Sequence, residues 1–385
     1  MSANNSFADY VSQAVEGGVD FARLRPGVES GLAKLLSHTQ MATARRMLFT
    51  GSGDSLFAAQ SAVPLLRRWT GVAASALSAI EFARYELPLL CGEDVVWGVS
   101  NSGSASRTRE AVMLARERGN LTVGVTGSKT GPLAELAECV LYRPVNALDD
   151  IDPRYRRVFL NMVEYLAALY ALYLSSLQIA VKIGRMDAST ADGWVEKIEA
   201  DIKSLGGMAG AHDSMAGELA RELQALDTLW VIGAGPSYGT ARYCAAKYHE
   251  QIPINGIPED LEEWAHLQYF LTLNWGARSV VIVLAPPGNS LDRAEELVEG
   301  IAGAGGRPVV VASPGHGRFP KAFYRFDVPG VEDEFLSPLT YHLPSQLLVL
   351  HLARLAEVPL TPLRREDEYF LIRKGVVLND GGGLR

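Results

Sequence analysis

Residues 47–55 have the sequence MLFTGSGDS, and residues 229–237 have the sequence LWVIGAGPS. Each stretch is an apolar run followed by glycine and small polar residues, which is typical of a buried strand ending in a tight turn before a helix. Two further pairs of similar stretches follow: VVWGVSNSGSAS (95–106) and VVIVLAPPGNS (280–290), then LTVGVTGS (121–128) and PVVVASPG (308–315).

The spacing between matching positions is nearly constant. Three matching pairs are separated by 182, 185 and 187 residues: Gly51 and Gly233, Ser100 and Ala285, Thr126 and Ser313. This regularity predicts two copies of one α/β domain. Strands that alternate with helices are typical of a mostly parallel sheet with helices on both faces. We expect a doubly wound, flavodoxin-like fold in each copy, with a ligand at the strand-to-helix turns.

The composition is that of an ordinary globular chain. It has 385 residues, 48% hydrophobic and 21% charged, which is enough for two domains with full cores. The net charge of −8 argues against a nucleic-acid partner, because a phosphate backbone needs a basic surface. Three widely spaced cysteines form neither a disulfide framework nor a metal-ligand pattern, and the N-terminus lacks a secretory signal. We expect a cytoplasmic protein without a metal.

Residues 163–180, VEYLAALYALYLSSLQIA, approach the length of a membrane span. Glu164 lies within this stretch, and charge inside a bilayer is costly. The stretch therefore predicts a buried core or interface helix, and no membrane partner is expected. Along the chain we expect four parts: N-terminal helices (1–45), the first α/β copy (46–185), the second copy (200–345), and a C-terminal helix and tail (346–385).

The turn at 100–106, SNSGSAS, precedes a predicted helix. Backbone N–H groups at a helix N-terminus attract anions, and serine hydroxyls add donors. Gly103 allows close approach of the backbone to a ligand. The turns at 51–55 and 126–128 belong to the same predicted sheet edge, so the three together indicate an anion site. The alternative is that serine and glycine are simply good turn and capping residues.

The order strand–GSGDS–helix, strand–SNSGS–helix, strand–VTGS, followed by a second copy of the pattern, resembles the sugar isomerase (SIS) domain family over roughly residues 40–380. The chain is similar to the isomerase half of the glutamine:fructose-6-phosphate amidotransferases and to stand-alone phosphosugar isomerases and deaminases. The resemblance implies two SIS domains and neither a metal nor an organic cofactor.

The resemblance also implies a sugar-phosphate site in the first copy, held by small polar residues of the turns: Ser52, Ser55, Ser100, Asn101, Ser102, Ser104 and Thr126. Gly53 and Ala105 depart from the family pattern, which has hydroxyl side chains there. Ser104 or Ser106 could replace the lost donor, and Arg107 could add charge. The second copy has APPGN at 285–289, where prolines lack N–H donors, so we expect one anion site per chain.

The catalytic residues implied by the resemblance lie in the second copy and the tail. The family's Lys-x-x-Glu pair matches Lys247 and Glu250, and its Glu-x-x-His setting matches Glu263 and His266. Its C-terminal lysine matches Lys374.

These residue types suit isomerisation through an enediol or enediolate. Glu250 could move the proton between C1 and C2, because a partly desolvated carboxylate is a suitable base. His266 could serve ring opening, since histidine exchanges protons near neutral pH. Lys374 could stabilise an oxyanion or form a Schiff base. Taken singly, each residue is equally explained as a solvated or structural side chain.

We therefore expect a phosphosugar isomerase, or an isomerase or deaminase of aminosugar phosphates, whose partner is a small sugar phosphate. The family resemblance adds a homodimer with a site that could be completed across the interface. Two alternatives stay open: a fructosamine-phosphate deglycase and a non-enzymatic sugar-phosphate sensor. The residues do not separate isomerase, deaminase and deglycase, because all three use the same base.

Overall fold

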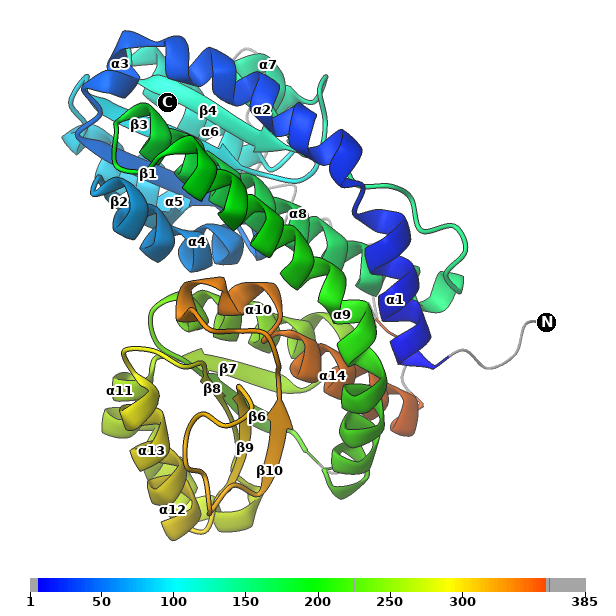
Figure 1. The fold of residues 1–385 in the computed structure, drawn as a ribbon. Coiled ribbons are helices and arrows are strands. Elements are labelled where there is room, and N and C mark those ends of the chain that lie inside the picture. The colour runs from blue at the N-terminus through cyan, green and yellow to red at the C-terminus, as the bar shows by residue number, and fades with distance from the viewer. Residues whose placement is uncertain (1–5, 224–225, 358–359, 361–385) are drawn as a thin grey trace.

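The structure, a computed structural model, describes residues 6–223, 226–357 and 360. Two five-stranded sheets lie in separate lobes (Figure 1). All of the strand pairs in the described residues are parallel. The predicted fold, two parallel α/β sheets with helices on both faces, is confirmed.

The first sheet has the order β2-β1-β3-β4-β5. Its strands are β1 (Arg46–Gly51), β2 (Ala73–Ser78), β3 (Asp94–Val99), β4 (Leu121–Thr126) and β5 (Cys139–Tyr142). Along β1, Phe49 belongs to one apolar cluster and Leu48 to another on the opposite face. The strand is a continuous apolar run because helices cover both faces.

The second sheet has the order β10-β9-β8-β6-β7. Its strands are β6 (Thr228–Ile232), β7 (Asn255–Glu259), β8 (Val280–Ala285), β9 (Arg307–Ala312) and β10 (Tyr324–Asp327). In both sheets the first strand in sequence lies between the second and the third. The direction of winding therefore reverses between β1 and β3, and between β6 and β8, and ligands of such sheets bind at this switch point.

Helices cover both faces of the first sheet. One face carries α2 (Phe21–Ser37), α4 (Asp54–Thr70) and α8 (Pro153–Lys182). The other carries α5 (Ala79–Glu81), a π-helical turn (Phe82–Glu86), a 3₁₀ turn (Leu87–Leu89), α6 (Ser106–Glu117) and α7 (Pro132–Leu136). The short helices α1 (Phe7–Gly18) and α3 (Thr39–Ala42) flank α2 in sequence.

The second sheet is covered in the same way. On one face lie α9 (Ala188–Glu222), α10 (Pro236–Gln251) and α14 (Leu343–Leu355). On the other lie α11 (Leu261–Glu263), a π-helical turn (Trp264–Gln268), α12 (Tyr269–Trp275), a 3₁₀ turn (Gly276–Arg278) and α13 (Leu291–Gly303). A further 3₁₀ helix, η5 (Glu334–Leu339), follows β10.

Helix α8 holds the apolar stretch that resembles a membrane span. It is long and apolar enough to cross a bilayer, but 83% of its most apolar window is buried inside the fold. It packs against α2, α4 and α9. The prediction of a buried core helix is therefore confirmed.

The two lobes meet through equivalent helices, since α4 follows the first strand of one sheet and α10 follows the first strand of the other. Gly239 of α10 makes this contact close. A Cβ added there would lie 2.6 Å from the backbone nitrogen of Ser61 and 2.8 Å from the carbonyl oxygen of Phe57. Only glycine fits, and the close contact brings the last turn of α10 to the first turn of α4.

Candidate active site

Three turns of the first lobe gather at the carboxyl edge of neighbouring strands. They follow β1, β3 and β4, which are adjacent in the sheet. The first two lead into α4 and α6, whose N-cap residues, Gly53 and Ala105, make no capping hydrogen bond through a side chain. Two helix N-termini thus lie at the ends of adjacent strands with N–H groups that no cap side chain occupies, a favourable setting for an anion.

The serine-rich turn after β3 presents hydroxyl groups to solvent. Ser102 and Ser104 are exposed, and their Oγ atoms lie 2.6 Å apart. The backbone N–H of Ser104 also donates to Ser102 Oγ at 3.2 Å. In the neighbouring turn Ser52 is exposed and Ser55 is half-buried, whereas Ser100 is buried at the strand end. The turns can therefore offer several hydroxyl donors to one anion.

Thr126 and Asn101, two of the predicted anion ligands, support the turn in this structure. Thr126 is fully buried, and its hydroxyl donates to the carbonyl oxygen of Asn101 at 3.0 Å. The backbone N–H of Gly127 donates to the same oxygen at 2.8 Å. The guanidinium of Arg143 donates to the side-chain oxygen of Asn101 at 3.0 Å. Burial lowers the pKa of Arg143 to about 10, so it stays charged at neutral pH.

Arg107, which the sequence offers as extra positive charge for the anion, is already paired. Its guanidinium bonds the carboxylate of Glu110, a residue with no exposed surface. Arg84 reaches the other oxygen of Glu110 at 2.6 Å. Both arginines therefore compensate a buried carboxylate behind the turn.

An ion cluster around the buried Lys247 joins the two lobes beside these turns. The ammonium of Lys247, on α10, lies 2.8 and 2.7 Å from the two carboxylate oxygens of Asp54, the first residue of α4. It also lies 2.7 Å from Oε2 of Glu250, one turn along α10. The Lys247 side chain is 1% exposed, that of Asp54 26% and that of Glu250 43%. Glu250 is thus the member of the cluster that is most open to a ligand.

The charged groups of this cluster shift one another's pKa values. Burial raises the pKa of Asp54, and the nearby Glu250 carboxylate raises it further, while Lys247 lowers it. Burial alone would lower the pKa of Lys247, but Asp54 and Glu250 together raise it. One ammonium faces two carboxylates, so the cluster carries one negative charge in excess when both acids are ionised.

An aromatic wall supports the lysine. Its Nζ lies 4.6 Å from the centre of the Tyr243 ring, which stacks on Tyr165 with ring centres 3.9 Å apart. His342 packs edge-on against both rings and is fully buried. Burial lowers the pKa of His342 to about 4, so this ring is neutral at physiological pH. A rigid apolar wall of this kind limits the positions open to the lysine.

Sequence reasoning missed two acidic residues of the site. Asp54 follows the glycine turn, where an acidic residue in a first helical turn is explained by the helix dipole alone. Glu164, on α8, was considered only as a charge within an apolar stretch. Burial raises its pKa, whereas Arg157, Arg143 and a hydrogen bond from Asn101 lower it. The sequence signal for Glu164 was that single charge in an apolar helix.

His266, another predicted catalytic residue, does not join the cluster in this chain. His266 lies in the π-helical turn after α11 with its side chain 72% exposed, and its ring lies 3.4 Å from Glu262. Apolar side chains around it are also exposed: Leu267, Phe270 and Leu273. Lys374 lies outside the described residues.

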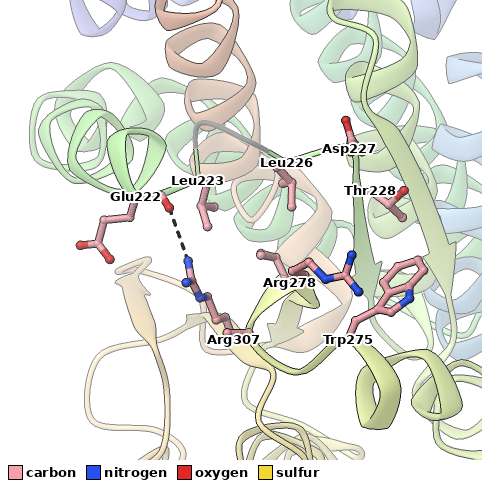
Figure 2. A pocket seen from close by; sticks show the side chains of 10 residues that line it. Glu222, Leu223, Leu226, Asp227, Thr228, Trp275, Arg278 and Arg307 are labelled. Atoms are coloured by element: carbon pink, nitrogen blue, oxygen red, sulfur yellow. Dashed lines mark hydrogen bonds between the residues drawn. The ribbon is translucent and has the colours of Figure 1, made fainter.

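A separate cavity of about 310 Å³ lies at the amino ends of the strands of the second sheet. Its lining includes Thr228, Val280 and Arg307, which begin β6, β8 and β9. Figure 2 shows the side chains of Arg278, Arg307 and Trp275 around it. Ligands of open α/β sheets bind at the carboxyl ends of strands, so this amino-end cavity is not our candidate site. Within the described ranges, no group of His, Cys, Asp and Glu could hold a metal ion.

Known proteins resemble this chain in sequence and in fold. Residues 40–175 match the SIS domain family. The glutamine–fructose-6-phosphate aminotransferase (isomerizing) of Thermococcus kodakarensis is 26% identical over 318 residues, covering 82% of this chain and 50% of the relative. The chain spans about half the length of the curated relatives it matches.

Two solved structures share the fold along most of their length. The C-terminal domain of the glucosamine-fructose-6-phosphate aminotransferase of Francisella tularensis has a TM-score of 0.73 at 15% identity, with 91% of this chain and 94% of that chain covered. The tagatose-6-phosphate ketose/aldose isomerase of Escherichia coli has a TM-score of 0.68 at 14% identity, with 94% and 96% covered. At these identities the likeness establishes the fold alone.

Proposed function

This chain is a SIS-domain protein, and we propose that it is a phosphosugar isomerase or an isomerase or deaminase of aminosugar phosphates. One observation carries the proposal. The turn after β1, one of the three turns of the candidate anion site, ends at Asp54, which Lys247 links to Glu250. An anion in the turns would therefore hold the rest of a small molecule beside a carboxylate base. The sequence relative named for fructose-6-phosphate chemistry supports this substrate class.

In this proposal Glu250 is the base. It takes the proton from the carbon next to the carbonyl, an enediolate forms, and the same carboxyl returns the proton to the neighbouring carbon. The Lys247 ammonium stabilises negative charge that develops nearby and keeps Glu250 oriented. The excess negative charge of the cluster lets it accept a proton without leaving a buried cation unpaired.

The same excess of carboxylate favours a substrate that carries an ammonium group. Asp54 and Glu250 share the single ammonium of Lys247, whereas Glu164 has both Arg143 and Arg157 as counter-charges. An amino sugar phosphate places its phosphate at the serines and its amine toward these acids. This observation supports the deaminase form of the proposal, in which ammonia leaves after the same proton transfer. The deglycase and the sensor remain alternatives.

We further propose that a second copy of the chain completes the site. His266 is exposed amid Leu267, Phe270 and Leu273, which are 53–62% exposed. The matching segment of the first repeat exposes Ile80, Tyr85 and Leu89. Apolar groups gathered on a surface favour association, and a homodimer through them would bring His266 to a partner's site for ring opening.

Lys374 stays our proposed contact for the carbonyl. The free cysteines suit a cytoplasmic location.

Ligand binding followed by isotope exchange tests the function. Thermal unfolding is measured with sugar phosphates, amino sugar phosphates and their unphosphorylated counterparts, because a ligand of the native state raises its stability. Compounds that stabilise the protein are then incubated in deuterated water and followed by NMR. Deuterium at C1 or C2 supports proton transfer, and released ammonia identifies the deaminase. Stabilisation without exchange indicates the sensor, and no response to any phosphate contradicts the proposal.

A further inference from the structure

The second repeat has a strand-to-helix turn that corresponds to the serine-rich turn of the first. Residues 286–290 connect β8 to α13, and residues 100–105 connect β3 to α6. The glycines of the two turns, Gly103 and Gly288, are 185 positions apart, the same offset that separates Ser100 from Ala285. The turns therefore match residue for residue, although the second contains Pro286 and Pro287 in place of an amide and a hydroxyl side chain.

A carboxylate of the chain itself lies in this second turn. The backbone N–H of Asn289 donates to Oε2 of Glu334 at 3.2 Å, and the side-chain amide of Asn289 donates to Oε1 at 2.6 Å. Both carboxylate oxygens thus accept a hydrogen bond from one residue of the turn. Glu334 is only 7% exposed.

Gly288 forms the floor on which this carboxylate rests. A Cβ added at Gly288 would overlap the Glu334 carboxylate and would lie 2.8 Å from Glu334 Cβ. A glycine cradle with backbone and amide donors above a helix N-terminus is the arrangement that binds anions in proteins. The occupant here is the chain's own side chain.

From this geometry we infer that residues 285–290 form a second anion-binding site, which Glu334 fills from within the chain. The ligand class is a carboxylate, and an external carboxylate of similar size fits the site when the Glu334 side chain is removed. A neighbouring cavity of about 400 Å³, lined in part by Gly288, Asn289 and Glu334, gives such a ligand a route to the turn.

The first lobe holds the occupying segment in place. Arg68, on α4, donates to both carboxylate oxygens of Asp333 at 2.9 and 2.7 Å, and its guanidinium lies 4.8 Å from the centre of the Phe335 ring. Asp333 caps η5, which begins at Glu334. The second turn is therefore closed by a segment tied to the opposite lobe, and only the first repeat keeps its turn open to external anions.

Chemical rescue tests this inference. Glu334→Ala removes the carboxylate, and thermal unfolding is followed in sodium acetate and in sodium chloride of equal ionic strength. We expect acetate to stabilise Glu334→Ala specifically. At ten times its Kd, acetate lowers the unfolding equilibrium constant about elevenfold. Wild type and Glu332→Ala, which removes an exposed carboxylate two residues away, should show no difference between the two salts, because Glu334 still fills the turn. An equal response of all three proteins overturns the inference.

A double-mutant cycle covers the case in which Glu334→Ala folds poorly. Gly288→Ala places a methyl group against the Glu334 carboxylate, so it should destabilise wild type by more than it destabilises the Glu334→Ser or Glu334→Ala protein, whose shorter side chains relieve the overlap. An equal cost in each background overturns the inference. If Glu334→Ala refolds only with added salt, recovery in acetate but not in chloride supports the inference, and equal recovery contradicts it. Neither measurement uses a sugar phosphate, so the outcome is separate from that of the proposed function.

Discussion

The ammonium of Lys247 lies 2.7 Å from a carboxylate oxygen of Asp54, although the two residues are 193 positions apart and belong to different lobes. A charge with 1% exposure is stabilised only by such partners. The contact therefore does two things at once: it fixes the lobes relative to each other, and it holds Glu250 beside the turn that we propose binds the anion.

Lys247→Met should destabilise the protein more than Asp54→Asn. Without the ammonium, two carboxylates face each other, whereas without Asp54 the lysine keeps Glu250. Breaking a buried pair costs about 3–5 kcal/mol, and the partial exposure of both acids reduces this to about 1–3 kcal/mol for Lys247→Met. Chemical denaturation of each variant measures the order.

A surface lysine provides the control for this comparison. Lys203 has a side chain that is 63% exposed and lies 3.7 Å from Glu199, so Lys203→Met should change the free energy of unfolding by less than about 0.5 kcal/mol. Equal costs for Lys203→Met and Lys247→Met would contradict the structural role of the cluster.

Glu250→Gln should abolish proton transfer while leaving binding intact. The amide keeps the shape of the side chain and can still accept from Lys247, but it cannot act as a base. We expect kcat to fall by on the order of a hundredfold or more, with little change in the Kd of the sugar phosphate. The control is Glu296→Gln on α13, whose side chain is 66% exposed. Retained deuterium exchange in Glu250→Gln would exclude this residue as the base.

The anion turn predicts two different responses to loss of a hydroxyl. Ser102 is exposed, so Ser102→Ala should raise the Kd of a sugar phosphate about tenfold, which corresponds to one hydrogen bond to a charged group. Thr126 is buried and donates to Asn101, so Thr126→Val should lower stability by about 1 kcal/mol and change the Kd less. Calorimetric titration and thermal unfolding separate the two effects, and a reversed pattern would contradict the assignment.

The sequence predicts the fold because the pattern that encodes it is local. Each apolar run with its glycine turn, such as the one ending at Gly51, predicts a strand and the start of a helix without reference to the rest of the chain. The pairing of Asp54 with Lys247 depends instead on α4 packing against α10 over Gly239, which is a tertiary event. The hydrogen bond from Thr126 to Asn101 also depends on the tertiary structure. The sequence predicts that a hydroxyl in a turn is a donor, but it does not predict the acceptor.

His266 gives a prediction about the assembly. If the site is completed across a dimer interface, Glu250→Gln and His266→Ala are each inactive as homodimers. Coexpression of the two variants then restores one intact site in every mixed dimer, so random pairing should recover about a quarter of wild-type activity. Recovery that does not exceed either variant alone would mean that His266 acts within its own chain or not at all. Light scattering of each variant confirms that association itself is unchanged.

His342 predicts how stability depends on pH. Its pKa is about 4 in the folded protein because burial disfavours the charged ring, against about 6.5 in the unfolded chain. Below pH 6.5 the unfolded state therefore binds a proton that the folded state resists, and stability falls as the pH falls toward 4. Between about pH 7 and pH 5 this one residue should remove ~2 kcal/mol from the free energy of unfolding.

Replacing the ring isolates this effect. His342→Phe keeps an edge-on aromatic contact with Tyr165 and Tyr243 but cannot bind a proton, so the loss of stability between the two pH values should shrink by about that amount. Phe is larger than His, and some overall loss of stability is expected at both pH values. The test therefore compares how much the free energy of unfolding changes between the two pH values in each protein. His316→Ala, at an exposed position, should leave the wild-type slope unchanged. A wild-type slope in His342→Phe would mean that other groups cause the acid sensitivity.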